Sequence, residues 1–472
     1  MNKTLQKFKY IIWDVLAAGL AWSIFFIYRK LLIEPNIFEH LNFVYEDVNF
    51  WFGLVVIPIF WNILYVSVGT YRKVYRKSRL KELSQTLSIS LFGVAIIFFT
   101  LILDDQIISY KNYYELLAIL FFTHFGITYI GRLLITLRTI KRIHKGKIGF
   151  NTLLIGSNGN AVKVYNDLIN QEYSSGNFFI GFVNAKHYDK FKMSSILPHL
   201  GTVSNIQQVL KDYKVEEVII AIERSETDTI TSIITDLEMH DVVIKIIPLF
   251  QDYIFGNIKA GGIFQTPLVE ISPDLMPVWQ TTVKRVFDIV VSIIAMILLI
   301  PVYLFTAIGV KLSSKGPVIY SQERIGHHGK PFRMHKFRSM YSDAEKMGTP
   351  QLSSKTDPRI TPFGRFIRKV RLDEIPQFFS VLKGDMSIVG PRPERQYFID
   401  KISERAPHYK LLGKIKPGIT SWGQVKYGYA ENVDEMIERL KYDLLYLENM
   451  SLAMDLKILI WTVLIVVQGR GK

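Results

Sequence analysis

The sequence predicts a multidomain membrane protein with three parts. These are a four-helix transmembrane bundle (residues 1–147), a Rossmann-like α/β middle domain (148–272) and a basic α/β domain (280–472) that begins with a re-entrant helix (284–311). Three observations predict this fold class. Four long apolar runs precede residue 140, short apolar segments alternate with helical patterns from about 150 to 270, and a fifth apolar run with basic flanks opens the remainder.

Composition narrows the protein class before any motif is considered. The chain has 472 residues, which at about 150 residues per domain is room for roughly three domains. Hydrophobic residues make up 49% and the mean hydropathy is +0.19, too apolar for a disordered chain. The net charge of +15 suits a membrane surface or a polyanionic partner. The absence of cysteine excludes disulfides, zinc–thiolate sites, iron–sulfur clusters and thiol nucleophiles.

The four N-terminal apolar runs are each long enough to cross a bilayer. About 20 residues at a rise of 1.5 Å span a hydrocarbon core of about 30 Å. The first run could instead be a signal peptide, because lysines precede it, but no small-residue cleavage site follows. We therefore predict an uncleaved first span. The runs are Ile11–Tyr28, Phe50–Val68, Leu83–Leu103 and Leu116–Leu137.

The charges of the connecting loops predict the orientation of the bundle. Lysine and arginine concentrate after the second and fourth runs, whereas the other two loops are mainly acidic. Because basic loops stay in the cytoplasm, both ends of the bundle and everything after residue 140 should face the cytoplasm. The basic residues are Arg72, Lys73, Arg76, Lys77, Arg79, Lys81, Arg138, Lys141, Arg142, Lys145 and Lys147.

The fifth apolar run, Ile289–Val310, predicts a helix that enters the membrane and returns to the same face. If it crossed, one basic flank and the basic remainder of the chain would lie outside, against the charge rule. Pro301 stands within the run and breaks helical hydrogen bonding, so we place the re-entrant break there. An ordinary fifth span with a kinked centre is the alternative. The flanking cations are Lys284, Arg285, Lys311 and Lys315.

The middle domain shows the rhythm of a doubly wound sheet. Strands are predicted at Asn151–Ile155, Phe178–Val183, Glu217–Ile222 and Val242–Ile247, with helical patterns between them. The turn Gly156–Ala161 lies where a dinucleotide fingerprint would sit, but its glycine spacing is degenerate. It is either a tight turn of a structural domain or a nucleotide site.

The positive charge is concentrated in one stretch. Residues 311–420 hold 22 Lys and Arg against 10 Asp and Glu. Nucleic acid fits this patch poorly, because no recognition-helix or zinc signature is present and the patch follows a membrane-embedded segment. Anionic lipid headgroups and a phosphorylated substrate at the bilayer fit better.

Within this stretch, an adjacent carboxylate pair lies among cations. One carboxylate of the pair Asp373 and Glu374 can act as a covalent nucleophile on phosphorus, because neighbouring guanidinium groups keep a carboxylate ionised. The other can hold Mg²⁺, so both are candidate metal ligands. A surface salt-bridge cluster is the alternative. The candidate phosphate-binding residues are Arg368, Arg392, Lys336, Arg338 and Arg359.

Other catalytic signatures are missing from the sequence. No D-x-D occurs, which disfavours an ordinary metal-dependent nucleotide-sugar transferase, and neither a phosphate-binding P-loop nor a G-x-S-x-G elbow is present. His327 and His328 are adjacent, so we interpret them as turn residues and not as metal ligands.

From about Thr282 to the C-terminus the chain resembles the bacterial sugar transferase family, the polyprenyl-phosphate phosphoglycosyl transferases. About 190 residues are covered, and the matching motifs occur in family order. They are Lys284–Asp288, Gly316–Val318, Gln322–Gly326, Lys336–Met340, Asp357–Thr361, Leu372–Gln377, Gly384–Glu394 and Pro417–Thr420.

The resemblance implies a fold and a reaction. It implies a monotopic α/β catalytic domain on the cytoplasmic face of the bacterial inner membrane. The four spans and the Rossmann-like middle domain resemble those of the large family members. It implies transfer of a hexose 1-phosphate from a UDP-sugar to undecaprenyl phosphate, with release of UMP. Asp373 matches the nucleophile that forms an aspartyl-phosphosugar, Glu374 matches its partner with Mg²⁺, and Arg368 and Arg392 match phosphate contacts.

The resemblance leaves alternatives for the sugar, the mechanism and the function. UDP-glucose and UDP-galactose are the favoured donors, but Lys426–Tyr429 replaces the family's usual Gly-Arg pair and leaves the sugar undetermined. The reaction would start a repeat unit of capsule, exopolysaccharide or O-antigen. Direct attack by the lipid phosphate, with Asp373 as a base, is a rival mechanism. A non-catalytic scaffold or nucleotide-sensing regulator is the alternative function, and a homodimer is one arrangement consistent with the sequence.

Overall fold

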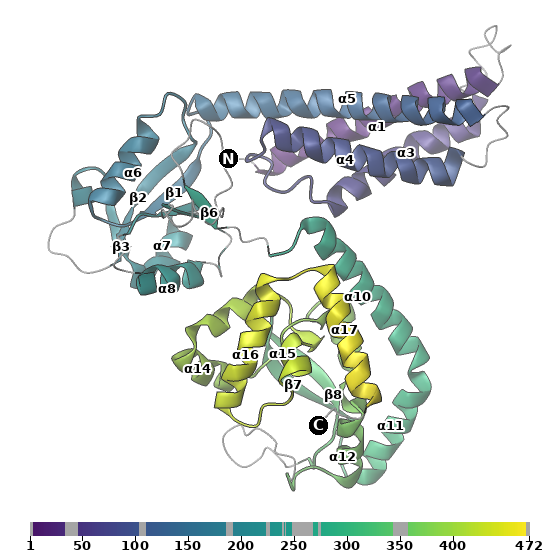
Figure 1. Cartoon of the computed structure of the whole chain (residues 1–472), viewed down its shortest axis with the longest axis vertical. Helices are drawn as coiled ribbons and strands as arrows, with labels where there is room; N and C mark the ends of the chain where they lie inside the picture. The colour runs from purple at the N-terminus through teal and green to yellow at the C-terminus, as the bar shows by residue number, and fades with distance from the viewer. Residues whose placement is uncertain are drawn as a thin grey trace. The chain divides into compact units, whose positions relative to one another are not determined.

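The computed structural model describes residues 3–33, 46–102, 110–185, 192–222, 227–237, 240, 242–247, 268–271, 275–342 and 357–468. The chain divides into two compact units, one made of residues 1–150 and 166–178 and the other of residues 151–165 and 179–472. Figure 1 shows a helical bundle, a six-stranded sheet with its helices, and a C-terminal α/β domain.

Four helices of the bundle are long and apolar enough to cross a membrane, as predicted. They are α1 (Lys3–Ile33), α3 (Val48–Ser67), α4 (Arg79–Ile97) and α5 (Tyr110–His144), and α4 continues into a π-turn over Phe98–Ile102. Asp47 and Ser78 cap α3 and α4 by accepting from backbone amides. Large apolar side chains such as Phe52, Phe92 and Phe122 are more than half exposed, which suits a surface in contact with lipid.

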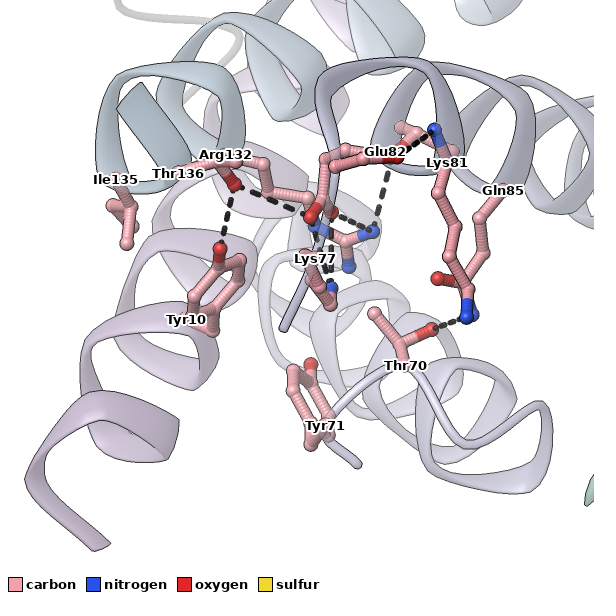
Figure 2. A network of polar contacts seen from close by, with 12 residues as sticks. Tyr10, Thr70, Tyr71, Lys77, Lys81, Glu82, Gln85, Arg132, Ile135 and Thr136 are labelled. Carbon is pink, nitrogen blue, oxygen red and sulfur yellow. Dashed lines mark hydrogen bonds and ion pairs between the residues drawn. The ribbon is translucent and has the colours of Figure 1, made fainter. Parts of the chain in front are cut away.

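A buried polar network holds the bundle together (Figure 2). The Arg132 guanidinium of α5 donates to both carboxylate oxygens of Asp14 in α1, at 2.8 and 2.7 Å. Glu82, in the first turn of α4, lies 3.0 Å from the Lys77 ammonium and 3.9 Å from Arg132. Tyr71, in the link before α4, donates to Asp14 at 2.7 Å. Two cations and two carboxylates therefore compensate one another between three helices and this link.

The middle sheet has the strand order β3-β2-β1-β4-β5-β6. The strands are β1 (Phe150–Ile155), β2 (Asn177–Asn184), β3 (His199–Thr202), β4 (Glu217–Ile220), β5 (Val243–Ile246) and β6 (Val269–Ile271). Strand β4 pairs in parallel with β1 and with β5, whereas β6 pairs with β5 in antiparallel fashion. The helices are α6 (Gly159–Ile169), α7 (Ile206–Asp212) and α8 (Thr227–Leu237). The four predicted strands are present, whereas β3 and β6 are too short for a clear sequence pattern.

The turn after β1 favours the structural interpretation over a nucleotide site. Gly156 has φ +133°, and a Cβ there would lie 2.6 Å from the Ala221 carbonyl oxygen, so only glycine fits. The side chain of Asn158 accepts from the amides of Asn160 and Ala161, at 3.1 and 3.2 Å. These amides, which would face a pyrophosphate, are already used by the helix cap.

The C-terminal domain begins with a broken apolar helix. The two segments, α10 (Val278–Leu298) and α11 (Ile300–Ser313), meet at an angle of 63°. The break lies at Leu299, two residues before the predicted position at Pro301. Pro301 stands in the first turn of α11, where a missing amide hydrogen leaves no helical bond unmade. The proline therefore starts a second helix instead of bending a continuous one.

The remainder of the domain packs around a β-hairpin and a short parallel strand pair. The hairpin is β7 (Ile319–Ile325) with β8 (Pro331–Phe337), and the pair is β9 (Ser387–Val389) with β10 (Gly418–Thr420). His327 and His328 form the hairpin turn, as predicted. The helices are α12 (Pro362–Lys369), α13 (Gln377–Lys383), α14 (Gln396–Arg405), α15 (Trp422–Lys426), α16 (Val433–Glu448) and α17 (Leu452–Val467), with a 3₁₀ segment η8 over Pro407–Lys414.

Two basic residues at the start of the broken helix fasten it to this domain. The Arg285 guanidinium donates to the carbonyls of Val381 and Leu382, at 2.7 and 2.8 Å. The Lys284 ammonium lies 2.6 Å from the Asp455 carboxylate of α17. These cations, interpreted from sequence as a membrane flank, thus join α10 to α13 and α17.

Candidate active site

The two adjacent carboxylates lie on a single 3₁₀ turn between two helices. Thr361 caps α12, its hydroxyl accepting from the Gly364 amide at 2.9 Å. Arg371 then adopts the left-handed conformation (φ +61°), which turns the chain out of α12 into the turn η7 (Leu372–Glu374). Asp373 and Glu374 are both 7% exposed, so this reversal places two carboxyl groups inside the domain.

Three cations from different elements surround Glu374. The Lys336 ammonium of β8 lies 2.9 Å from its Oε1, and the guanidinium groups of Arg392 and Arg371 lie 3.4 and 3.3 Å from its two oxygens. Burial opposes ionisation of Glu374, but these three positive charges outweigh it and hold the pKa of its carboxyl well below the usual range. Glu374 is therefore a fixed negative charge.

Asp373 differs from its neighbour in both contacts and ionisation. Within the described ranges, no hydrogen bond or ion pair reaches its carboxylate. Burial, together with the charge of Glu374, raises the pKa of the Asp373 carboxyl, although Lys336, Arg368 and Arg371 act in the opposite direction. The cations that were predicted to keep the nucleophilic carboxyl ionised have that effect on Glu374 instead.

All of the predicted catalytic, metal-binding and phosphate-binding residues border one cavity of about 300 Å³. It is open to both carboxylates and is lined by side chains from the hairpin, from α12 and from the segment that follows β9. The sequence-predicted residues on its wall are Lys336, Arg338, Arg359, Arg368, Asp373, Glu374 and Arg392. The fold thus collects motifs that are up to 56 positions apart in the chain, from 336 to 392.

Two of these arginines are also used by the fold. Arg338, beyond the end of β8, donates to the carbonyls of Ser314 and Lys315, at 2.7 and 3.1 Å, and so caps the chain leaving α11. Arg338 lies one residue beyond β8, so it is not on the strand that carries Lys336. The Arg359 guanidinium is paired with Asp357 in its own turn, at 2.6–3.1 Å.

The structure adds site residues that the sequence did not predict. Glu394 accepts from the guanidinium groups of Arg324 and Arg439, at 3.1 and 2.7 Å, and all three border the cavity. Glu394 and Arg324 stand inside quoted motifs but had been given no role. Arg439 had one signal in the sequence: together with Asp443, four residues later, it interrupts the apolar face of α16.

The carboxylate pair could hold a magnesium ion only with help from other oxygens. No group of three or more acidic or histidine side chains that could bind a metal occurs in the described part of the chain. Mg²⁺ is commonly held by one or two carboxylates, with water and phosphate oxygens completing its shell. Asp373 and Glu374 supply two such carboxylates, although both oxygens of Glu374 already contact cations, and oxygens of a phosphorylated ligand would complete the shell.

This arrangement suits chemistry at phosphorus. Guanidinium and ammonium groups bind phosphate oxygens and stabilise charge that develops on them. A carboxylate without a hydrogen-bond donor keeps its lone pairs available for attack. Lys336 is close enough to bind a phosphate oxygen at this site. Burial and the charge of Arg392 lower the pKa of its ammonium group more than Glu374 raises it.

Two family models match the chain. A model described as bacterial sugar transferase matches residues 279–469, the whole C-terminal domain and its site. A model described as CoA-binding domain matches residues 67–248, which include the middle sheet through β5.

Curated relatives match over different lengths. A UDP-N-acetylgalactosamine-undecaprenyl-phosphate N-acetylgalactosaminephosphotransferase of Aeromonas hydrophila is 39% identical over 216 residues, 46% of this chain and 50% of the relative. A UDP-glucose:undecaprenyl-phosphate glucose-1-phosphate transferase of Escherichia coli K12 is 30% identical over 77% of this chain and 78% of the relative. An undecaprenyl-phosphate galactose phosphotransferase of Salmonella typhimurium LT2 is 29% identical over 89% of this chain and 87% of the relative. The match thus spans half of the first relative and more than three quarters of the other two.

Proposed function

The chain belongs to the bacterial sugar transferase family, and from that premise we propose that it is a phosphoglycosyl transferase. It moves a sugar 1-phosphate from a UDP-sugar to undecaprenyl phosphate and releases UMP. The observation that carries this proposal is the position of Asp373, whose carboxylate borders one cavity with Lys336, Arg368 and Arg392.

The reaction proceeds in two balanced displacements. An Asp373 carboxylate oxygen attacks the β-phosphorus of the UDP-sugar, the bond from that phosphorus to the bridging oxygen breaks, and UMP leaves with the electron pair. An oxygen of undecaprenyl phosphate then attacks the same phosphorus. The bond to Asp373 breaks, its carboxylate is restored, and undecaprenyl-diphospho-sugar is formed.

Each neighbouring charge has a role in this scheme. Arg368 and Arg392 bind the phosphate oxygens, with Lys336 close to both carboxylates. Arg338 and Arg359 border the phosphate site while they hold the chain after α11 and the turn before α12. Glu374 fixes the positions of Lys336, Arg371 and Arg392.

Magnesium is part of the proposal. Asp373 and Glu374 would hold the ion together with oxygens of the substrate phosphates. When bound, Mg²⁺ would neutralise negative charge on the diphosphate.

The position of the catalytic domain at the membrane follows from its apolar helices. We propose that the bent pair α10–α11 enters the bilayer and returns to the cytoplasmic face of the bacterial inner membrane. The 63° bend and the exposed apolar side chains of Ile297, Leu304 and Ile308 support this placement. Lys284 and Arg285, which tie α10 to the domain, keep the site next to the membrane surface.

We propose a class of donor sugar and a class of pathway. The relatives are named for glucose, galactose and N-acetylgalactosamine, so a UDP-hexose or UDP-N-acetylhexosamine is the donor class. The product would start a repeat unit of capsule, exopolysaccharide or O-antigen, and a homodimer is compatible with this activity.

The test is the substitution Asp373→Asn in the full-length protein. We expect UMP release to fall at least about 1,000-fold, because an amide oxygen is a poor nucleophile. With UDP-sugar labelled in the sugar and no lipid acceptor, wild-type protein should retain label and the variant should not. A control substitution, Asp385→Asn, changes a carboxylate that is partly exposed, pairs with Lys383 and does not border the cavity, so it should preserve activity.

The outcomes separate the alternatives. Transfer without trapped label would favour direct attack by the lipid phosphate, with Asp373 as a base. Absence of transfer with any UDP-sugar, in wild-type protein, would favour the scaffold or regulator reading.

A further inference from the structure

The cavity wall has two chemically different parts, contributed by elements on opposite sides of the hairpin (Figure 1). One part is bordered by Pro317, Tyr341 and Arg368, next to α11 and α12. The other is bordered by Phe398 of α14, Tyr429 of the loop after α15, and Met436 of α16. Figure 1 shows α14 and α16 on the opposite side of the hairpin from α11 and α12.

The part beside α11 adjoins an apolar surface. Leu304, Phe305 and Leu312 of α11 are 58–82% exposed, and Phe366 of the contacting helix α12 is 47% exposed. A substrate that carries a long hydrocarbon chain would reach the cavity from this surface. The other part is therefore left for the water-soluble substrate.

The part beside α14 and α16 combines an apolar floor with aromatic and cationic walls. Phe398, Ala430 and Met436 are buried members of one core cluster whose surfaces close the cavity. The ring of Tyr429 is half-buried on its wall, and the Arg395 guanidinium borders the same cavity. A flat heterocycle fits such a place, because bases stack on aromatic rings and guanidinium planes, and arginine can donate to ring carbonyls.

A buried carboxylate holds the arginines of this part of the cavity in place. Glu394 is 4% exposed and accepts from Arg439 at 2.7 Å and from Arg324 at 3.1 Å. Tyr429 borders the same cavity as Arg324 and the phosphate-site Arg392. The aromatic wall is thus adjacent to the proposed diphosphate site.

We propose that this part of the cavity binds the pyrimidine nucleoside of the donor, with the Tyr429 ring as its stacking surface. The inference rests on the proposed function and deepens it. Tyr429 lies in the loop that follows α15, which ends at Lys426. Glu394 is a positioning residue, which acts through Arg439 and Arg324.

Binding of UMP to the full-length protein tests the stacking surface directly. We expect Tyr429→Leu to raise the dissociation constant for UMP, measured by calorimetry, at least 10-fold. Tyr429→Phe, which keeps the ring, should change it less than threefold. Tyr427→Leu is the matched control: it alters a tyrosine two residues away that is 39% exposed and is not on the cavity wall, and UMP binding should not change. Melting temperatures identify any variant that fails to fold.

Steady-state kinetics then assign this part of the cavity to a substrate. Tyr429→Leu should raise the KM for the UDP-sugar and leave the KM for undecaprenyl phosphate within twofold. The inference is overturned if Tyr429→Leu raises only the KM for undecaprenyl phosphate. It is also overturned if Tyr429→Leu binds UMP as well as wild-type protein does. In that second case, a raised KM for the UDP-sugar would show that this part of the cavity binds the sugar and not the nucleoside. If wild-type protein binds UMP through Tyr429 but transfers nothing, the proposed function fails while the nucleoside site stands.

Discussion

Asp373 and Glu374 are neighbours in the chain and equally buried, yet their surroundings act on them in opposite directions. Glu374 contacts three cations within 3.4 Å and stays charged. For Asp373, burial and the fixed charge of Glu374 raise the pKa. The pair therefore separates two tasks: one carboxylate organises the cations, and the other is left reactive.

This difference predicts the acid side of the pH–activity profile. Asp373 must be ionised to attack, so activity falls as the pH drops through its pKa, which lies above the ordinary value of about 4. Lys336 lowers that pKa, so Lys336→Met should shift the acid limb of kcat/KM to higher pH, by about one pH unit.

The control for that shift is another lysine of the same hairpin. Lys330 is exposed at the turn and does not border the cavity, so Lys330→Met should leave the limb in place. An unmoved limb in Lys336→Met, or an equal movement in both variants, would contradict the assignment of this limb to Asp373.

The sequence predicted several residues of the active site but not the contacts that each of them makes. Asp373, Glu374, Lys336 and Arg392 could be selected from their motifs, and they do meet at one cavity. The pairing of Glu394 with Arg439 could not be selected, because it joins positions 45 apart through the packing of α16. The opposite behaviour of the two carboxyl groups also depends on the three-dimensional placement of the cations.

At the scale of helices, the bundle depends on charges that lie inside it. Arg132 and Asp14 are fully buried and form a bidentate pair between α5 and α1. Arg132 also donates to Thr86 of α4 at 3.3 Å, and its guanidinium lies 4.0 Å from the centre of the Tyr65 ring. The pairing fixes which faces of these helices meet, since a shift of either helix would leave charges unpaired.

Arg132→Met should destabilise the bundle strongly. The substitution leaves the Asp14 carboxylate without its partner in a buried site, which typically costs about 3–5 kcal/mol. In lipid nanodiscs we expect a markedly lower melting temperature for full-length protein. The double variant Asp14→Asn with Arg132→Met should recover part of the loss, because it also removes the uncompensated charge.

Arg138→Met supplies the comparison. Arg138 is exposed six residues further along α5, so its removal should leave the melting temperature near the wild-type value. Equal melting of Arg132→Met and wild type would show that the buried pair does not hold the bundle.

Helix positions were easier to predict than the reasons for their ends. The apolar runs located all four long helices, because about 20 consecutive apolar residues leave few alternatives. The break in the fifth run was placed at Pro301, but proline is also well accommodated in a first turn, and the bend falls at Leu299. The short strands β3 and β6, with four and three residues, carry too little alternation to be seen without the sheet.

At the scale of the whole molecule, the bent helix pair decides where the chemistry takes place. Arg338 joins the chain after α11 to the cavity, and Lys284 and Arg285 join α10 to the same domain. If the pair re-enters, both of its ends and the active site share the cytoplasmic face. If it crosses, the site faces the other side, away from a cytoplasmic supply of nucleotide sugar.

Because the chain contains no cysteine, single cysteines can distinguish these two arrangements. Lys315→Cys lies just after α11 and is exposed, so in intact cells a membrane-impermeant maleimide should fail to label it if the pair re-enters. Glu46→Cys, before α3, should be labelled from outside, and Lys145→Cys, after α5, only once the membrane is opened. Labelling of Lys315→Cys in intact cells, with Lys145→Cys still protected, would establish a fifth span and reject the re-entrant arrangement.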